Sequence, residues 1–321
     1  MKTLAIGRIC QDEFYLVRTA KNRIASTKLT ADYIGRQFGG SVFSEAKMLA
    51  EAGVDCTFLA GVSLGEDAFL KMPLSLKIVK TPATSRSFIY LKEGYKLDRI
   101  YSLEETEGEK IEPIPSLIEE IASEIAPSRL LYDLRQIPLT KALQKRLSGK
   151  NVQTFLDPGS TVFYTEDSEK KQEMASVIGQ SDIICAGLDF FEHYGRFTRL
   201  SDYFSLPLFE NAKLLVATLS DGRNIFAARE FRFTVHRLNQ LSIGNTMGAG
   251  DAFRGAFLAT WQQTWDAVTY DGVLEGAKMA VAAATLKIED KDPLPKMPRM
   301  EDVKALAERL AIRVKQDDSL L

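Results

Sequence analysis

Short apolar runs separated by polar, turn-forming segments are the main pattern along the chain. The runs at 3–7 and 54–62 have the length of buried strands, and 41–52 between them carries apolar residues at helical spacing and ends at Gly53. From about residue 104 onward, helical and strand-like segments alternate, which is typical of βαβ units stacked around a mostly parallel sheet. The pattern predicts helices at 116–125, 140–148, 169–179, 251–263, 272–287 and 300–314, and strands at 130–132, 152–156, 182–185, 213–218, 224–227 and 231–235.

Two segments near the N-terminus fall outside this alternation. Residues 87–101 read as a hairpin whose turn contains Gly94, and residues 14–37 begin with the apolar run 14–17 before becoming polar. We therefore expect a doubly wound α/β core of residues 1–13, 38–86 and 102–321, with 14–37 and 87–101 set aside as a small separate β-sheet.

Composition says more about the possible chemistry of the protein than about its fold. Hydrophobic residues make up 45% of the 321 residues and charged residues 26%, which is ordinary for a soluble globular protein. Lys and Arg number 41 against 43 Asp and Glu, so the net charge of -2 gives no electrostatic reason to expect nucleic acid as a partner. Two histidines and three widely spaced cysteines argue against a disulfide framework, a Cys/His zinc site and histidine-based acid–base catalysis. A carboxylate is then the expected proton-transfer group.

No apolar run is long enough to suggest a membrane span. The run near 279–286 is far shorter than the ~20 residues that a spanning helix needs, and Arg8 interrupts the first apolar run. We expect a cytoplasmic protein with no membrane partner.

The stretch from 245 to 258 carries the clearest chemical signal. Its Gly248-Ala249-Gly250 loop runs directly into an amphipathic helix, whose first backbone N–H groups have no partners inside the helix. Small residues let an anion approach these groups and the helix dipole favours negative charge there, so the loop is a candidate anion-binding site. Asp251 at the helix start has two interpretations that the residues alone leave open. It is either an N-cap or a base that takes a proton from an attacking hydroxyl.

Two other nucleotide-binding loops are absent from the sequence. The only Gly-Lys pair that could belong to a P-loop, Gly149-Lys150, is followed by Asn151 where Ser or Thr is required. The G-x-G-x-x-G fingerprint of dinucleotide-binding proteins does not occur either. An anion held at 248–250 would therefore be bound by a loop of another kind.

The same stretch resembles the second signature of the ribokinase-like carbohydrate kinases, the PfkB family. That signature reads Asp-Thr-x-Gly-Ala-Gly-Asp, and residues 245–251 match it with Asn245 in place of the more common Asp. Further segments resemble the family in the same order along nearly the whole chain. They are the strand end at 7–12, the Gly39-Gly40 pair with the helix up to Gly53, the Gly-x-Asp-x-Phe turn at 65–69, and the strand and turn at 216–222.

The resemblance implies a ribokinase-like three-layer α/β/α sandwich with a mostly parallel central sheet and a small β lid. It also implies transfer of the γ-phosphoryl group of ATP to a hydroxyl of a small sugar or sugar derivative, with Mg²⁺ as the cation. By this match Asp251 is the catalytic base, and the amides of Gly248, Ala249 and Gly250 hold the charge on the transferring group. The matching substrate-binding positions are Asp12, Gly39, Gly40 and Ser44, and the matching nucleotide-binding positions are Thr218, Ser220, Gly222 and Thr246.

Two departures from the family pattern bear on the expected function. Ser44 stands where the family usually has Asn, and Gly187 and Phe190 stand in place of the Asn and Glu of a metal-organising Asn-x-x-Glu motif. Asp189 or Glu192 is a candidate replacement as metal ligand, because carboxylates suit Mg²⁺.

These departures leave two alternatives to a sugar kinase. One is a nucleoside kinase of the same fold, and the other is a sugar-binding sensor that has lost efficient phosphoryl transfer. Arg254, one turn after Asp251, is open between a surface residue, an interface residue and a phosphate ligand. The resemblance also suggests a homodimer through the lid strands, whose open edges favour pairing.

Overall fold

The computed structural model describes most of the chain. The described residues are 1–18, 30–63, 74–92, 95–101, 110–159, 167–238, 244, 246–264, 267–292, 294 and 296–320. The turn expected at 65–69, Asn245, and the parts of the expected lid at 19–29 and 93–94 lie outside them. Among the helices of the described ranges, none is both long and apolar enough to span a membrane.

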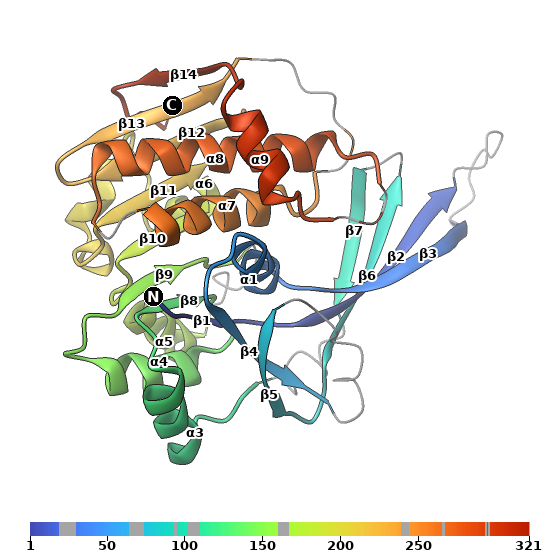
Figure 1. Cartoon of the computed structure of the whole chain (residues 1–321), viewed down its shortest axis with the longest axis vertical. Helices are drawn as coiled ribbons and strands as arrows, with labels where there is room; N and C mark the ends of the chain where they lie inside the picture. The colour runs from blue at the N-terminus through green and yellow to red at the C-terminus, as the bar shows by residue number, and fades with distance from the viewer. Residues whose placement is uncertain are drawn as a thin grey trace.

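One large sheet forms the centre of the molecule (Figure 1). Within the described residues it has ten strands in the order β14-β13-β12-β11-β10-β9-β8-β1-β4-β5. The strands from β11 to β5 in this order run parallel, and β12, β13 and β14 add an antiparallel edge. Their bounds are β1 (Thr3–Ile6), β4 (Cys56–Val62), β5 (Ser75–Lys80), β8 (Arg129–Tyr132), β9 (Gln153–Leu156), β10 (Ile183–Gly187), β11 (Leu214–Thr218), β12 (Arg223–Ala228), β13 (Arg232–Arg237) and β14 (Ile312–Lys315).

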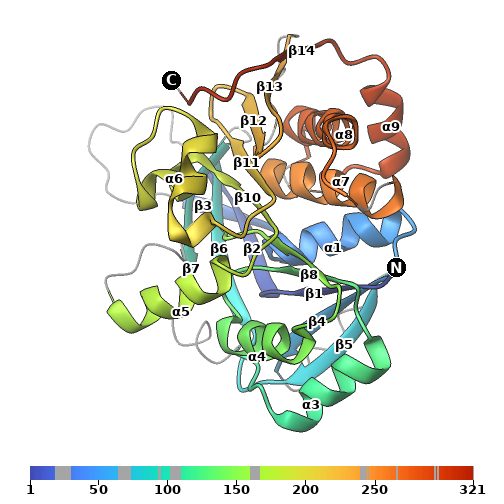
Figure 2. The ribbon, with the colours of Figure 1, turned by 90° about the vertical axis from the view of Figure 1, so that its left-hand side faces the viewer.

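Helices cover both faces of this sheet. The strand β1 is mostly apolar because both of its faces are buried. Ala5 packs into the core on one face of the sheet, and Leu4 and Ile6 pack into the core on the other. One face carries α1 (Ser41–Glu51), α7 (Ala249–Thr264), α8 (Tyr270–Glu289) and α9 (Met300–Ala307). The other face carries α3 (Pro115–Glu120), which continues into a π-helical turn at Ile121–Ile125, α4 (Ile137–Leu147), α5 (Ser168–Ile178) and α6 (Leu188–Tyr194). Figure 2 shows α7 and α8 on the opposite side of the sheet from α4, α5 and α6, so the predicted α/β/α sandwich is confirmed.

A second, smaller sheet extends away from this sandwich (Figure 1). Its strands are β2 (Cys10–Arg18), β3 (Thr30–Gly39), β6 (Ser85–Lys92) and β7 (Tyr95–Tyr101), in the order β3-β2-β6-β7. Phe14, Ile89 and Leu91 form its small buried core. The strands β2 and β6 begin before residues 14 and 87, where we expected the separate sheet to begin. Asp12 therefore lies within this smaller sheet.

The predicted helix at 300–314 is wrong beyond its first half. The helix α9 ends at Ala307, and the chain then forms β14, which pairs with β13. The physical reason is visible in the last residues, because Ile312 and Val314 are half-buried and alternate with exposed Arg313 and Lys315. This period of two suits a strand at the edge of a sheet better than a helix.

The helices α1 and α7 pack closely where Gly255 faces α1. A Cβ atom at Gly255 would lie 3.0 Å from the Met48 Cβ and 3.3 Å from the Glu45 Cα. Both distances are tighter than ordinary side-chain packing, so the helices approach this closely only because residue 255 has no side chain.

We expect Gly255→Val to push α7 away from α1. Overpacking of this kind costs about 1–3 kcal/mol in the free energy of unfolding, and urea denaturation measures it directly. An unchanged urea midpoint would show that the two helices can separate without cost.

Candidate functional site

Two pockets meet at the N-terminal end of α7. Gly248 and Asp251 line the first pocket, whereas Ala249 and Gly250 line the second. The first pocket lies at the carboxyl ends of parallel strands, because Asp133 directly follows β8 and also lines it. Crevices at this edge of an open α/β sheet are the usual place for ligands.

The four predicted substrate-binding residues all line the first pocket. Asp12 comes from β2 and accepts a hydrogen bond from the hydroxyl of Ser87 on the neighbouring strand β6. Gly39 ends β3, Gly40 caps the N-terminus of α1, and Ser44 lies in the first turn of α1. Gly40 has a φ of 126°, and a side chain there would overlap the carbonyl oxygen of Arg8. The double glycine therefore lets the smaller sheet pass directly into the helix beside the pocket.

Asp133 is a residue of the first pocket that the sequence analysis missed. Its carboxylate accepts the backbone N–H groups of Arg8 at 3.2 Å and Arg135 at 2.8 Å. Burial raises the pKa of Asp133 to about 6, although these two hydrogen bonds oppose the shift. The available signal was its place directly after a buried parallel strand, where polar residues reach the ligand-binding edge.

The second pocket is bounded by the β11–β12 turn and by α7 and α8. Thr218 and Gly222 of the predicted nucleotide-binding set line it. Ser220 and Thr246 are exposed and are not among its lining residues, although the Thr246 carbonyl accepts the N–H of Ala249 at 3.3 Å. Much of its wall is apolar and comes from Phe253, Val281, Ala284 and Ile288.

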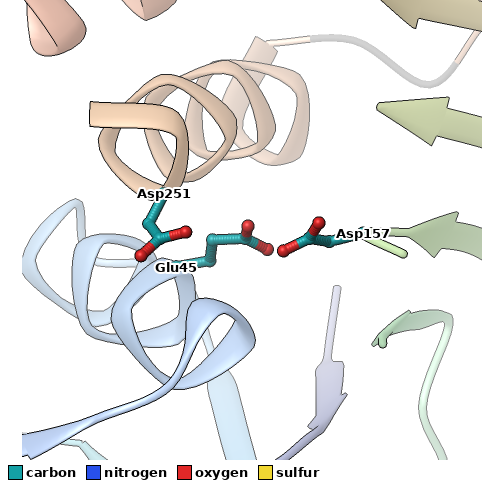
Figure 3. Close-up of side chains that lie close together, drawn as sticks. All are labelled: Glu45, Asp157 and Asp251. Atoms are coloured by element: carbon teal, nitrogen blue, oxygen red, sulfur yellow. The ribbon is translucent and has the colours of Figure 1, made fainter. Parts of the chain in front are cut away.

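Three carboxylates from three elements lie close together beside the first pocket (Figure 3). They are Glu45 of α1, Asp157 directly after β9, and Asp251 of α7, and each offers an oxygen within 4.8 Å of the others. The guanidinium of Arg254 holds them together. Its Nε lies 2.6 Å from Glu45 Oε1, and its Nη2 lies 3.1 Å from Asp157 Oδ2 and 2.7 Å from Asp251 Oδ1. We call these four residues the Arg254 cluster.

The Arg254 cluster is almost entirely buried. The side chains of Glu45 and Asp157 are 0% and 2% exposed, and that of Arg254 is 10% exposed, whereas Asp251 reaches the first pocket with 22%. Burial raises the pKa of Glu45 well above its usual range, the charges of Asp157 and Asp251 add to this, and Arg254 opposes it. Burial alone would lower the pKa of Arg254, but the surrounding carboxylates outweigh it and raise that pKa.

The sequence analysis did not find this cluster. Residues 45, 157 and 254 share no spacing, and only the tertiary packing of α1 and α7 against the end of β9 brings them together. Arg254 is buried among carboxylates, so it is not the surface residue that its sequence position allowed.

A magnesium ion is usually held by one or two carboxylates together with water and substrate phosphates. Asp189 and Glu192 are exposed on α6, and neither lines the first or the second pocket. The three carboxylates of the Arg254 cluster are close enough to share a cation, but the guanidinium already contacts all three. Neither group therefore fits a resident magnesium ion.

A second buried cation, Lys287 of α8, lies beneath the loop at Gly248. Its Cε is 3.7 Å from the place where a Cβ of Gly248 would be, and its side chain is 0% exposed. The Lys287 Nζ has no hydrogen-bond partner within the described part of the chain, and the nearest carboxylate, that of Asp290, is 3.8 Å away. Burial lowers the pKa of Lys287. Its charge adds to the positive potential at the start of α7.

The raised pKa of Asp133 predicts a specific pH dependence of stability. The folded protein binds this proton more tightly than the unfolded chain between pH 3.8 and about 6, so the natural chain loses stability as pH rises through that range. We expect the stability of Asp133→Asn relative to the natural chain to rise by up to about 3 kcal/mol over this range and then stay level. Urea denaturation of both proteins at a series of pH values measures the difference, and a difference that is constant with pH would contradict the prediction.

Comparison with known proteins gives a match at the level of structure only. No protein-family model matches the chain, and no curated protein matches it by sequence. The structure is similar to the ribokinase of Giardia lamblia, with a TM-score of 0.75, 17% identity, and 96% of this chain and 99% of that chain covered.

Two further solved structures are similar over nearly their whole length. A carbohydrate kinase from Agrobacterium tumefaciens has a TM-score of 0.72 at 15% identity, with 98% of this chain and 100% of that chain covered. A nucleoside kinase of the ribokinase family from Methanocaldococcus jannaschii has a TM-score of 0.69 at 14% identity, with 96% and 99% covered. Identities this low show the fold, and the ribokinase-like fold that the sequence predicts is confirmed.

Proposed function

We propose that this chain, which has the ribokinase-like fold, is an ATP-dependent kinase that phosphorylates a hydroxyl of a small sugar or sugar derivative. The observation that carries the proposal is the position of the α7 N-terminus between two pockets. Asp251 faces the polar pocket, and Ala249 and Gly250 face the other. A phosphoryl group held at the loop would be in reach of ligands from both sides.

The first pocket suits the acceptor. Asp12 and Ser44 offer hydrogen-bonding groups for sugar hydroxyls, and the Asp251 carboxylate is available to take the proton of the attacking hydroxyl. Its other polar lining residues include Arg8, Lys47 and Asp133. This lining matches a compound with many hydroxyl groups better than it matches a flat nucleobase, which favours a sugar over a nucleoside as the substrate.

The second pocket suits ATP. Phe253, Val281 and Ala284 provide apolar surface for the base, and the loop at its other end provides backbone N–H groups for the terminal phosphates. Preorganised donors of this kind stabilise the charge that develops on the transferring phosphoryl group. Magnesium, when it enters with the nucleotide, supplies further neutralisation of the phosphate charges.

A sugar-binding sensor without transfer activity remains the second candidate. It is motivated by the missing Asn and Glu at positions 187 and 190. Asp251 counts against it, because a protein that only binds sugar has no need for a carboxylate held at the end of the anion-binding loop.

Replacement of the proposed base gives the direct test. We expect Asp251→Asn to lower kcat by about 10²–10⁴-fold, which is the usual contribution of a general base, while the KM for ATP changes little. The measurement is ATP-dependent ADP release with Mg²⁺ on a panel of sugars, ketosugars, polyols and nucleosides. Asp271→Asn, an exposed acid in the first turn of α8, is the matched control. If the natural chain binds a sugar in calorimetry but turns none over, the sensor alternative is favoured.

The assignment of the two pockets can be tested separately. Ala284 is half-buried in the second pocket, so Ala284→Phe adds a ring where the nucleotide base would lie. We expect the KM for ATP to rise about 5- to 30-fold, as the loss of about 1–2 kcal/mol of apolar contact with the base implies, while the KM for the sugar stays the same. Glu275→Phe places the same ring on an exposed position of α8 and is the control. A rise in the KM for the sugar alone would reverse the assignment.

A further inference from the structure

Arg254 connects the Asp251 carboxylate to two acids that reach neither pocket. We infer that Arg254 is a positioning residue for the base, and that Glu45 and Asp157 tune its effect by sharing the guanidinium charge. This inference rests on the proposed role of Asp251 as the base. It assigns a function to three buried charged residues that phosphoryl transfer itself does not use.

The contacts distinguish the two oxygens of Asp251. Arg254 Nη2 holds Oδ1 at 2.7 Å, and Oδ2 lies 4.0 Å from the place of a Cβ at Gly248, which also lines the first pocket. Oδ2 is then the oxygen that takes the proton of the substrate hydroxyl. As the proton moves to Oδ2, the hydroxyl oxygen bonds to the γ-phosphorus, and the bond from that phosphorus to the departing ADP oxygen breaks. The positions of both oxygens depend on the guanidinium.

The remaining contacts control the strength of the base. An arginine alone beside a carboxylate stabilises its ionised form and makes it a weaker proton acceptor. Here the same guanidinium also lies 2.6 Å from Glu45 and 3.1 Å from Asp157. These two acids offset part of the effect of Arg254 on Asp251, so Asp251 is a stronger proton acceptor than it would be beside an arginine alone. Glu45 and Asp157 act on Asp251 and its guanidinium from the buried side, because neither lines the first or the second pocket.

Other titratable groups face Asp251 from the neighbouring elements. Arg8, Asp12, Lys47, Asp133 and Arg135 line the same pocket. Cys185 of β10 lies against the cluster, and Lys287 of α8 lies beneath Gly248. These groups are unchanged in the variants below, so they contribute equally to every profile that is compared.

The test uses two substitutions that should move the acid limb of the pH profile in opposite directions. The acid limb is the fall of kcat/KM at low pH. Asp157→Asn keeps the shape and an acceptor for Arg254 but removes a carboxylate, so Asp251 becomes more acidic. We expect the acid limb of kcat/KM for the sugar to move down by about one pH unit, with kcat reduced several-fold. Arg254→Gln removes the cation, so we expect the limb to move up by about one unit, with kcat reduced at least about tenfold. Glu51→Gln, exposed at the end of α1, should change neither quantity.

Opposite displacements are a result that a purely structural role would not give. If both variants lose activity with the acid limb unmoved, or if both move it the same way, the inference is overturned. Arg254→Gln alone leaves Glu45 and Asp157 without their cation and could prevent folding. The Asp157→Asn/Arg254→Gln double variant then replaces it, and its limb should lie above that of Asp157→Asn.

A direct titration separates this inference from the proposed function. The carbon-13 resonance of the Asp251 carboxyl, identified by its loss in Asp251→Asn, reports its protonation without any turnover. The same opposite displacements between Asp157→Asn and Arg254→Gln support the inference even if no substrate is phosphorylated, in which case the proposed function alone fails. An unmoved resonance in an active enzyme overturns the inference and leaves the proposed function standing.

Discussion

The ionic contacts of Arg254 are the interaction on which the arrangement of the site depends. They connect α1, the end of β9 and α7 through side chains that are nearly without access to water. Buried charges are costly unless each has its partners in place, and removal of one partner leaves the others uncompensated. The close approach of α1 and α7 at Gly255 is therefore more than good packing. It keeps Glu45 within reach of the guanidinium, and so it keeps Asp251 in one orientation at the edge of the first pocket.

The rest of the proposed chemistry follows from the topology of the sheet and the start of one helix. Parallel strands bring the residues after β8 and β9 to one edge, and α7 begins in the glycine loop, where the first-turn N–H groups have no partners within the helix. The smaller sheet contributes Asp12 to the same pocket. Phosphoryl transfer needs positioned charges and donors and little covalent work by the protein. The proposed chemistry therefore needs no histidine, which agrees with the two histidines of this chain.

The sequence was informative wherever structure depends on local pattern. Buried parallel strands gave continuous apolar runs, and the loop at 248–251 carried its chemistry in consecutive residues, so the fold and this part of the site could be predicted. Residues 14–37 were expected in the smaller sheet, but β3 could not be delimited within them because most of its positions are exposed or half-buried, which leaves no apolar run. The exchange of helix for strand after Ala307 depended on pairing with β13. Glu45, Asp157 and Arg254 could not be found because their relation exists only after the chain has folded.

If the start of α7 binds an anion as proposed, stability and ligand binding make opposite demands at Lys287. A buried ammonium group without a hydrogen-bond partner destabilises the empty protein, and an apolar residue of similar length would fill the same space at lower cost. Selection for stability alone would therefore remove the charge, whereas an anion at the start of α7 makes it favourable. In descendants of this chain that had lost their anionic ligand, Lys287 would be free to drift to Met or Leu. The residue at position 287 would thus record whether a lineage still binds the ligand.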